Sequence, residues 1–508
     1  MPALPDDLVH QQVTWGECDT DGLKEDQADC AVISAPMDYR NPQGKRIDVA
    51  ISRIRAADPA KRHGILLTNP GGPGSEGRSL ASALKKQPAQ DYYDVIGMDP
   101  RGVGKSTQLL CGPYQEAAVG SRPSEADFPK ITKAAEEEEA ACVKAGGDFR
   151  QHVTTMNTAR DLDLIRQVLG EQKISFLGFS YGTFLGAMYG QLFPRNLDRI
   201  VLDSAMDPRK TWKLGEAADV AATKANVAAW QSWAAARDSR FHLGTDPQQI
   251  RATMDRLVAV PADDQDAATR LFDKAVGGGA RYRAHWADLA ATLTALLPTL
   301  SGSKPAAQPA GSLESLSKLD DEPDSSVHRQ ARVGEDADYR DKDGDKDGDK
   351  DGDKDNDKPK PGNGTMQAIL CDWAWPSNPE DYYPEMKRVE AEVPFGDSVG
   401  RVAPFNCAFS HGRDPMVEIG PRQYGGGLVV QAEGDTQTAY ADGAAAADYL
   451  GMSLITVTNS GIHGHYNSTG NACVDDAVNA YLITGSLSGK RTSCAAAKDI
   501  APDVPSGN

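Results

Sequence analysis

A serine between glycines stands where a strand is expected to turn into a helix. Residues 178–182 (GFSYG) follow the apolar run at 174–177 and begin an apolar helical stretch. In this context a G-x-S-x-G turn exposes the serine hydroxyl, because glycines two residues before and after it permit the tight turn. The pattern predicts that Ser180 is a nucleophile, and the alternative is an ordinary serine at a helix N-cap.

A serine nucleophile needs donors that stabilise the oxyanion formed on attack. Residues 69–75 (NPGGPGS) directly follow another expected strand. A glycine-rich turn at this place can direct backbone N–H groups toward a substrate oxygen. We expect the N–H groups of Gly72 and Tyr181 to form the oxyanion hole, with a plain Gly/Pro loop as the alternative reading of the turn.

The serine also needs a base and an orienting carboxylate, which follow the nucleophile in chain order in sheets of this type. Asp435 comes just after the expected strand Leu428–Ala432, with Glu433 and Asp442 as rivals. Asp435 is favoured, because Glu433 is nearer the interior of the strand and Asp442 lies within the next expected helix.

Two histidines, His463 and His465, follow the expected strand at 453–457, and neither spacing nor periodicity separates them as the base. The pair could instead bind a metal. No carboxylate or third histidine is spaced nearby to complete such a site, so neither a metal nor another cofactor is expected.

Residues 99–106 (DPRGVGKS) end like a P-loop, but Asp99 stands where that pattern requires glycine. We interpret the stretch as a structural turn, with Arg101 as a local ion-pair anchor.

The elements that must position these residues indicate an α/β fold. Expected strands at 64–68, 93–98, 174–178, 199–202, 428–432 and 453–457 alternate with expected helices at 155–169, 439–450 and 474–483. Between the two groups the composition becomes Ala-rich and helical, with expected helices at 217–235 and 280–297 and no convincing strand before 427. We therefore predict one sheet formed by residues 1–207 and 426–508, interrupted by a helical insertion at 208–425.

Inside the insertion, residues 301–364 contain few large apolar side chains and are expected to form a disordered loop. Its tandem DGDK tract places Asp343, Asp345, Asp347 and Gly348 as in the first half of an EF-hand loop. Lys354 stands where the bidentate Glu should be, so a solvated low-complexity tract is favoured over a calcium site.

The composition limits the partners. With 54 Lys and Arg against 73 Asp and Glu, the 508-residue chain has a net charge of −19, which argues against nucleic acid. Its apolar runs are far shorter than the roughly 20 residues that cross a bilayer.

Eight cysteines without a CxxC pair favour disulfides and an exported protein over reduced thiols in a cytosolic one. The simplest connectivity pairs neighbours along the chain: Cys18–Cys30, Cys111–Cys142, Cys371–Cys407 and Cys473–Cys494. The N-terminus shows no signal sequence, so we expect a mature secreted form. The oligomeric state stays open, with a monomer as the simplest expectation.

Together these stretches resemble the secreted bacterial tripeptidyl aminopeptidases and related proline-type exopeptidases of the α/β-hydrolase superfamily. The matching motifs are NPGGPGSEG from Asn69, DPRGVGKS from Asp99, SFLGFSYGTFLGAMYGQLFP from Ser175, VLDSAMDP from Val201, QAEGDTQTAY from Gln431 and HGHYNSTGNACV from His463. The resemblance implies an α/β-hydrolase core with a helical lid, paired cysteines and no metal. It also implies Ser180 as nucleophile, Asp435 as acid and His463, rather than His465, as base.

The implied activity is release of tripeptides from the free N-termini of peptides or proteins, with proline before the cleaved bond as a further expectation. Such an enzyme must bind the substrate α-ammonium about 10 Å from the cleaved bond, if three residues are extended at ~3.3 Å each. A carboxylate from the cap or its borders is required, but the sequence does not identify it. The alternatives are an esterase or lipase with the same triad and an inert extracellular binding protein.

Overall fold

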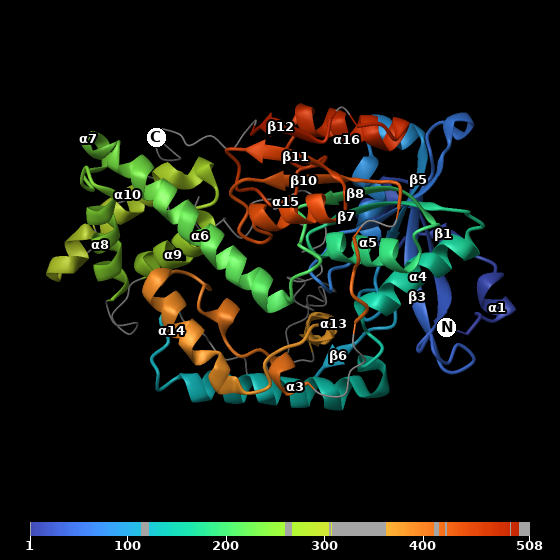
Figure 1. Ribbon diagram of the computed structural model, residues 1–508, viewed down its shortest axis with the longest axis horizontal. Coiled ribbons are helices and arrows are strands. Elements are labelled where there is room, and N and C mark those ends of the chain that lie inside the picture. Colours follow the sequence, from blue (N-terminus) through green and yellow to red (C-terminus); the bar gives the residue numbers. More distant parts are fainter. Residues whose placement is uncertain are drawn as a thin grey trace, which may run out of the picture.

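The computed structural model describes residues 2–112, 121–259, 267–303, 306, 362–410, 416–421, 424–487 and 489–496. Ten of its strands form one sheet (Figure 1). In spatial order the strands are β1 (Gly16–Glu17), β2 (Asp29–Pro36), β3 (Arg46–Ile54), β5 (Tyr93–Met98), β4 (Gly64–Asn69), β7 (Ile174–Phe179), β8 (Leu197–Asp203), β10 (Leu428–Ala432), β11 (Ser453–Thr458) and β12 (Arg491–Ala495).

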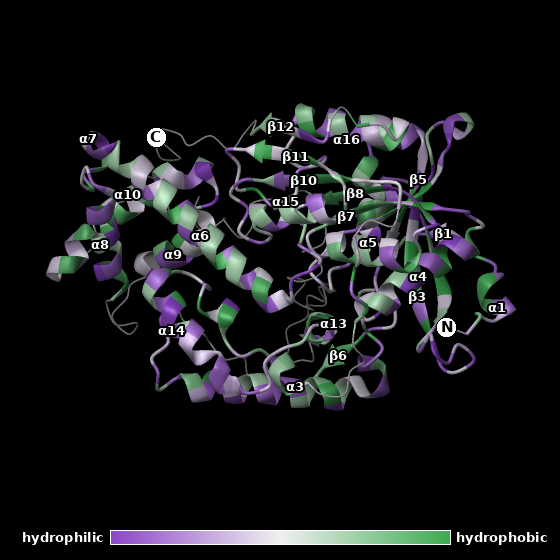
Figure 2. Ribbon diagram, viewed as in Figure 1, coloured by the Kyte–Doolittle hydropathy of each residue, from purple (hydrophilic) through white to green (hydrophobic). Residues whose placement is uncertain are grey.

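The middle of the sheet is parallel and buried. From β5 onward in this order every neighbouring pair is parallel, whereas β1, β2, β3 and β5 pair antiparallel. Every residue of β4, β7 and β10 is buried, as expected for strands covered on both faces. Figure 2 shows mostly hydrophobic residues around β7 and β8. The carboxyl ends of β4, β7, β10 and β11 therefore lie at one edge of the sheet.

Helices cover both faces of the sheet (Figure 1), as expected for the predicted α/β fold. The helices of this part are α1 (Asp6–Val9), α2 (Asp21–Glu25), α4 (Thr155–Val168), α5 (Tyr181–Leu192), α15 (Tyr440–Tyr449) and α16 (Ala472–Thr484). Residues of α4, α5 and α15 share one hydrophobic cluster with the sheet, and residues of α16 belong to the cluster on the opposite face.

A second, helical region lies beside the sheet, at the left of Figure 1. The helices of this region that follow β8 are α6 (Trp212–Ala235), α7 (Asp238–Phe241), α8 (Pro247–Val258), α9 (Ala267–Lys274), α10 (Trp286–Leu296) and α14 (Tyr383–Glu392). The short helix α13 (Thr365–Ile369) packs instead on the hydrophobic cluster of the sheet through Ala368 and Ile369. The helix expected at 280–297 begins only at Trp286, because residues 275–279 and 283–285 form separate single turns. The DGDK tract lies outside the described residues.

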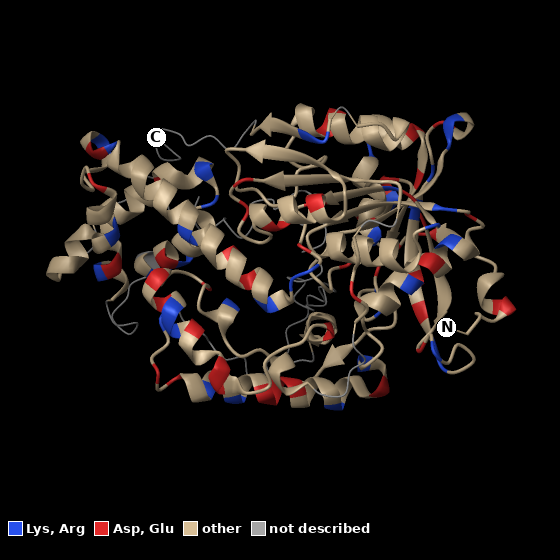
Figure 3. Ribbon diagram, in the orientation of Figure 1, with Lys and Arg blue, Asp and Glu red and all other residues tan. Residues whose placement is uncertain are grey.

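One helix differs from the expected division of the chain. Helix α3 (Phe128–Arg150) falls within the range 1–207 assigned to the core, yet Phe128 and Ile131 join the hydrophobic cluster of the helical region. The Thr132 hydroxyl lies 2.8 Å from the Tyr383 hydroxyl on α14. Figure 3 shows alternating charges along α3, which lies at the rim of the molecule. The helical region is therefore built from two separate stretches of sequence.

A short two-stranded ladder lies near the segment that leads to α3. Strand β6 (Leu110–Cys111) pairs antiparallel with β9 (Gly362–Asn363), in the stretch where no strand was expected. Two residues are too few for a periodic pattern, so the sequence carries no signal for this strand.

The structure joins the cysteines in the four pairs expected from chain order. The disulfides are Cys18–Cys30, Cys111–Cys142, Cys371–Cys407 and Cys473–Cys494. In the described part of the chain, no helix combines the length and the hydrophobicity that a membrane span needs.

Candidate active site

Ser180 occupies a strained turn between β7 and α5. Its φ of 54° and ψ of −128° are unfavourable for a residue with a side chain. The backbone N–H of Ser180 donates a 3.0 Å hydrogen bond to the carbonyl of Asp203 at the end of β8. The neighbouring strand thus holds the turn in a conformation that projects the serine side chain from the sheet edge.

The flanking glycines are required by close backbone approaches. A Cβ on Gly178 would lie 2.4 Å from the Gly182 carbonyl oxygen, and one on Gly182 would lie 2.7 Å from the Asn69 carbonyl oxygen. The loop after β4 also approaches the serine turn closely, since a Cβ on Gly71 would lie 2.9 Å from the Ser180 Cβ. The strand-end loop and the serine turn are therefore packed backbone against backbone.

The two residues expected to form an oxyanion hole lie next to Ser180. Gly72 lines the same cavity as Ser180, and Tyr181 is the first residue of α5. Backbone N–H groups in the first turn of a helix have no partner within the helix. The arrangement is suited to bind an oxyanion, and the role of both residues stays a prediction.

Asp435 and His463 form a buried pair at the ends of β10 and β11. The Asp435 Oδ2 lies 2.7 Å from the His463 Nδ1, and both side chains are fully buried. The N–H of Gln437 and the hydroxyl of Thr438 donate to the same carboxylate at 2.8 and 3.0 Å. With Nδ1 held by Asp435, Nε2 is the nitrogen through which His463 can exchange a proton with a serine.

The environment of Asp435 favours the ionised carboxylate. Burial alone raises the pKa of Asp435, but the charge and hydrogen bond of His463, the charge of Arg281 and the N–H of Gln437 outweigh it. The pKa is therefore below its usual value, and Asp435 is an acceptor for the imidazole N–H.

The rival residues make other contacts. The His465 Nε2 lies 3.1 Å from the Ile462 carbonyl oxygen, and burial lowers the pKa of His465 to about 4. The Glu433 carboxylate accepts from the N–H of Asn459, and Asp442 contacts the Lys210 ammonium. Among the contacts described, none of these three rivals takes part in a carboxylate–imidazole pair like that of Asp435 and His463.

The GKS-containing turn is structural. Asp99 accepts hydrogen bonds from the N–H groups of Gly77, Arg78 and Lys105, which closes the turn around its carboxylate. Arg101 is fully buried and forms a bidentate pair with Asp161 on α4, at 2.6 and 2.7 Å. Arg101 is thus an ion-pair anchor, but the prediction of a local one was wrong, because its partner lies 60 residues further along the chain.

Two carboxylates of α6 face the cavity of Ser180. This cavity of about 190 Å³, called the catalytic cavity below, is also lined by Glu216, Asp219, Arg401 and Thr438. The Asp219 carboxylate accepts a 2.9 Å hydrogen bond from the N–H of Ala439. Helix α6 therefore brings acidic groups close to the loop that carries Asp435.

Arg401 is shared among three carboxylates. It lies 3.2 Å from Glu216, 3.8 Å from Asp219 and 3.0 Å from Asp397. Burial and the neighbouring Glu216 raise the pKa of Asp219 well above its usual value, and burial also raises the pKa of Glu216. One guanidinium does not balance these acids, so an added cation in the cavity would be favourable.

Glu216 and Asp219 were not identified from the sequence. They stand three residues apart on an Ala-rich helix and so share one face. The spacing of three residues was the only signal in the sequence that could have identified them. It is equally typical of acidic residues on a helix face exposed to solvent.

Comparison with known proteins identifies the family of this chain. An α/β-hydrolase fold model matches residues 64–289, and a model of TAP-like proteins matches residues 406–494. The tripeptidyl aminopeptidase of Streptomyces coelicolor is 30% identical over 523 residues, covering 95% of this chain and 86% of the relative. The chain belongs to the tripeptidyl aminopeptidase family of α/β-hydrolases.

Two further relatives of this family member have different names. The serine protease Hip1 of Mycobacterium tuberculosis is 32% identical over 264 residues, covering 49% of this chain and 50% of that protein. Carboxylesterase B of the same organism is 29% identical over 525 residues, covering 97% and 92%. The predicted enzyme class is confirmed, and the chain is a serine exopeptidase.

Proposed function

We propose that this exopeptidase releases tripeptides from free N-termini by acyl transfer through Ser180, His463 and Asp435. Ser180 attacks the carbonyl of the cleaved bond while His463 accepts its proton at Nε2 and Asp435 fixes the imidazole. The N–H groups of Gly72 and Tyr181 stabilise the oxyanion. His463 then protonates the leaving amine, and water hydrolyses the acyl-enzyme.

The observation that carries the proposal is the acidic end of the catalytic cavity. Glu216 and Asp219 line the cavity of Ser180 on α6 and share a single guanidinium, that of Arg401. A substrate α-ammonium placed there would supply the missing positive charge. An ester or an acetylated peptide offers no such cation, so this arrangement favours an aminopeptidase.

Matched substrates test this assignment. We expect a tripeptidyl p-nitroanilide with a free amine to be cleaved, and its N-acetyl derivative to lose about 100-fold or more in kcat/KM, as expected when a buried charge pair is lost. Equal rates on both substrates would contradict the aminopeptidase assignment.

Variants of the acidic residues locate the contact. Glu216→Gln and Asp219→Asn should raise KM for the free-amine substrate while changing the slow rate on the acetylated one much less. Asp397→Asn is the matched control, because Asp397 also pairs with Arg401 but is 66% exposed and does not line the cavity. An equal effect of all three variants would assign the loss to Arg401 instead.

A carboxylesterase is the second candidate, favoured by the similarity to carboxylesterase B over 97% of this chain. The same triad would attack an ester carbonyl. Rapid hydrolysis of p-nitrophenyl acyl esters, together with no tripeptide release, would support it.

Secretion, a monomeric state and proline before the cleaved bond are part of the proposal. The four disulfides support an oxidising compartment. Fractionation of the producing cells, sizing chromatography and p-nitroanilides that differ only in the third residue test the three statements in turn.

A further inference from the structure

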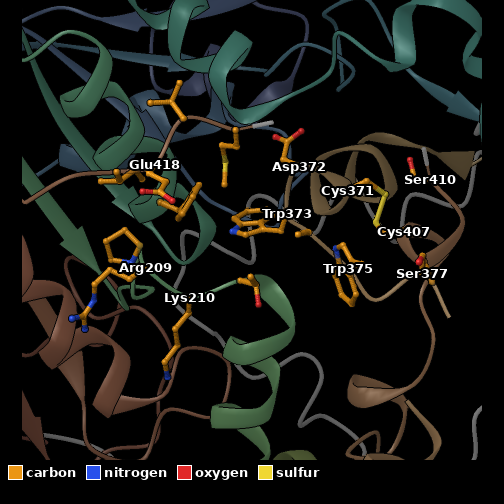
Figure 4. Close-up of a pocket in the computed structure, with 18 of the residues that line it drawn as sticks. Arg209, Lys210, Cys371, Asp372, Trp373, Trp375, Ser377, Cys407, Ser410 and Glu418 are labelled. Atoms are coloured by element: carbon orange, nitrogen blue, oxygen red, sulfur yellow. A yellow bond between two sulfur atoms is a disulfide. The ribbon is translucent and has the colours of Figure 1, made fainter. Parts of the chain in front are cut away.

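A larger cavity adjoins the catalytic cavity. It has a volume of about 740 Å³, against about 190 Å³, and Lys210 and Thr211 line both. The Thr211 hydroxyl accepts from the N–H of Leu214 and caps α6, so the start of this helix is the partition. Figure 4 shows the larger space between Arg209 and Lys210 on one side and Trp373 and Trp375 on the other. We call it the aromatic cavity.

The rings of the aromatic cavity are held in place by contacts within the protein. The indole N–H of Trp375 donates to the Leu370 carbonyl at 2.8 Å, and its ring is stacked 5.8 Å from the ring of Phe405. The Tyr449 hydroxyl donates to the Ile419 carbonyl at 3.1 Å. Rigid aromatic surfaces lose little conformational entropy when they bind a peptide.

One ring contact connects the two cavities. The ring centre of Trp373 in the aromatic cavity lies 5.6 Å from that of Trp212, which lines the catalytic cavity. Trp373 also packs 4.7 Å from Phe184, which lies four residues after Ser180. An apolar wall thus runs from beside Ser180 into the aromatic cavity.

Both cavities reach the surface. Met366 in the catalytic cavity and Val417 in the aromatic cavity are each 41% exposed, whereas the Asp219 side chain in the catalytic cavity is 7% exposed. A substrate whose N-terminus is bound at Glu216 and Asp219 and whose cleaved bond lies at Ser180 continues beyond Ser180, where the apolar wall leads into the aromatic cavity.

We propose that the aromatic cavity binds the residues that follow the cleaved bond, with their apolar, aromatic or proline side chains against Trp373, Trp375 and Tyr449. This inference rests on the proposed function, which fixes the direction of the chain. The volume of the aromatic cavity, about 740 Å³, is within the ~300–1,000 Å³ typical of ligand sites. The enzyme therefore favours substrates that continue several residues beyond the bond over those that end directly after it.

The test compares two substrates with the same first three residues. One is the tripeptidyl p-nitroanilide, and the other is a heptapeptide with apolar residues after the cleaved bond. We expect Trp375→Ala to lower the ratio of kcat/KM for the heptapeptide to that for the p-nitroanilide about tenfold, and Trp375→Phe to restore most of it.

Trp15→Ala is the matched control, because Trp15 is a half-buried tryptophan packed under Arg53, before strand β1. It should leave the ratio as in the wild type. An unchanged ratio in Trp375→Ala, with an active wild type, would overturn this inference and leave the proposed function intact. If the wild type cleaves neither substrate, or Ser180→Ala cleaves both, the proposed function fails and this inference with it.

Discussion

The buried carboxylate of Asp203, at the end of β8, accepts a 2.9 Å hydrogen bond from the backbone N–H of His465. The N–H of Tyr466 donates to the same oxygen at 2.7 Å. Because the Asp203 carbonyl also accepts from the N–H of Ser180, one residue holds both the serine turn and the loop that carries His463. The relative placement of nucleophile and base therefore depends on the end of one strand.

The burial of Asp203 and His465 predicts two opposing effects of pH on stability. Burial raises the pKa of Asp203 to about 6 from 3.8, so the folded state binds the extra proton and the free energy of unfolding falls as pH rises from 3.8 to 6. Burial lowers the pKa of His465 to about 4 from 6.5, so the free energy of unfolding rises between pH 4 and 6.5. Each effect amounts to ~3 kcal/mol at most.

Single variants separate the two effects. Relative to the wild type, Asp203→Asn should make the free energy of unfolding rise more steeply between pH 4 and 6, and His465→Gln should make it rise less. Urea unfolding at several pH values measures both slopes. Parallel curves for the wild type and both variants would show that neither group has the shifted pKa.

The two histidines should differ sharply in activity. His463→Ala removes the base and should lower kcat by on the order of 10⁴-fold or more. His465→Gln keeps the base and should leave kcat within about tenfold of the wild type. Steady-state rates on a tripeptidyl p-nitroanilide decide between them, with melting temperatures to establish that both variants fold. The opposite ranking would move the base to His465.

Asp435 should be the carboxylate on which the base depends. Asp435→Asn should lower kcat by on the order of 10⁴-fold, because the amide favours the wrong imidazole tautomer. Glu433→Gln is the control, since the exposed Glu433 carboxylate accepts only a loop N–H, that of Asn459, among the contacts described. Similar losses in both variants would argue that neither carboxylate has a specific role.

The Cys371–Cys407 bridge should contribute substantially to stability. It closes a loop of 36 residues, for which the chain-entropy relation gives ~4 kcal/mol. The Cys371→Ala/Cys407→Ala variant should therefore unfold at a lower urea concentration than the Cys18→Ala/Cys30→Ala variant, whose loop has 12 residues. No change in either variant under non-reducing conditions would show that these cysteines are not bonded.

The sequence alone was sufficient to predict the strand, turn and helix around Ser180 and the strands that precede Asp435 and His463. The strand before Ser180 and the helix after it are each continuous apolar segments, and the glycines between them have one physical explanation. Asp435 and His463 could be proposed because each follows a strand whose end lies at the same sheet edge.

Contacts between elements that are far apart in the sequence could not be predicted from the sequence alone. The pattern of α3 predicts a helix but not the surface on which it packs, so its contact with α14 through Thr132 and Tyr383 could not be foreseen. Glu216 and Asp219 carry meaning only because the fold places α6 against the cavity of Ser180. An acidic pair on a helix has no such meaning by itself.

The central claim is tested most directly by mass spectrometry of a free-amine peptide library after incubation with the wild type and with Ser180→Ala. We predict that the wild type releases N-terminal tripeptides and that Ser180→Ala releases none, with the fragments reporting the residue before the cleaved bond. Tripeptides in the Ser180→Ala sample, or an intact library after incubation with the wild type, would contradict the account.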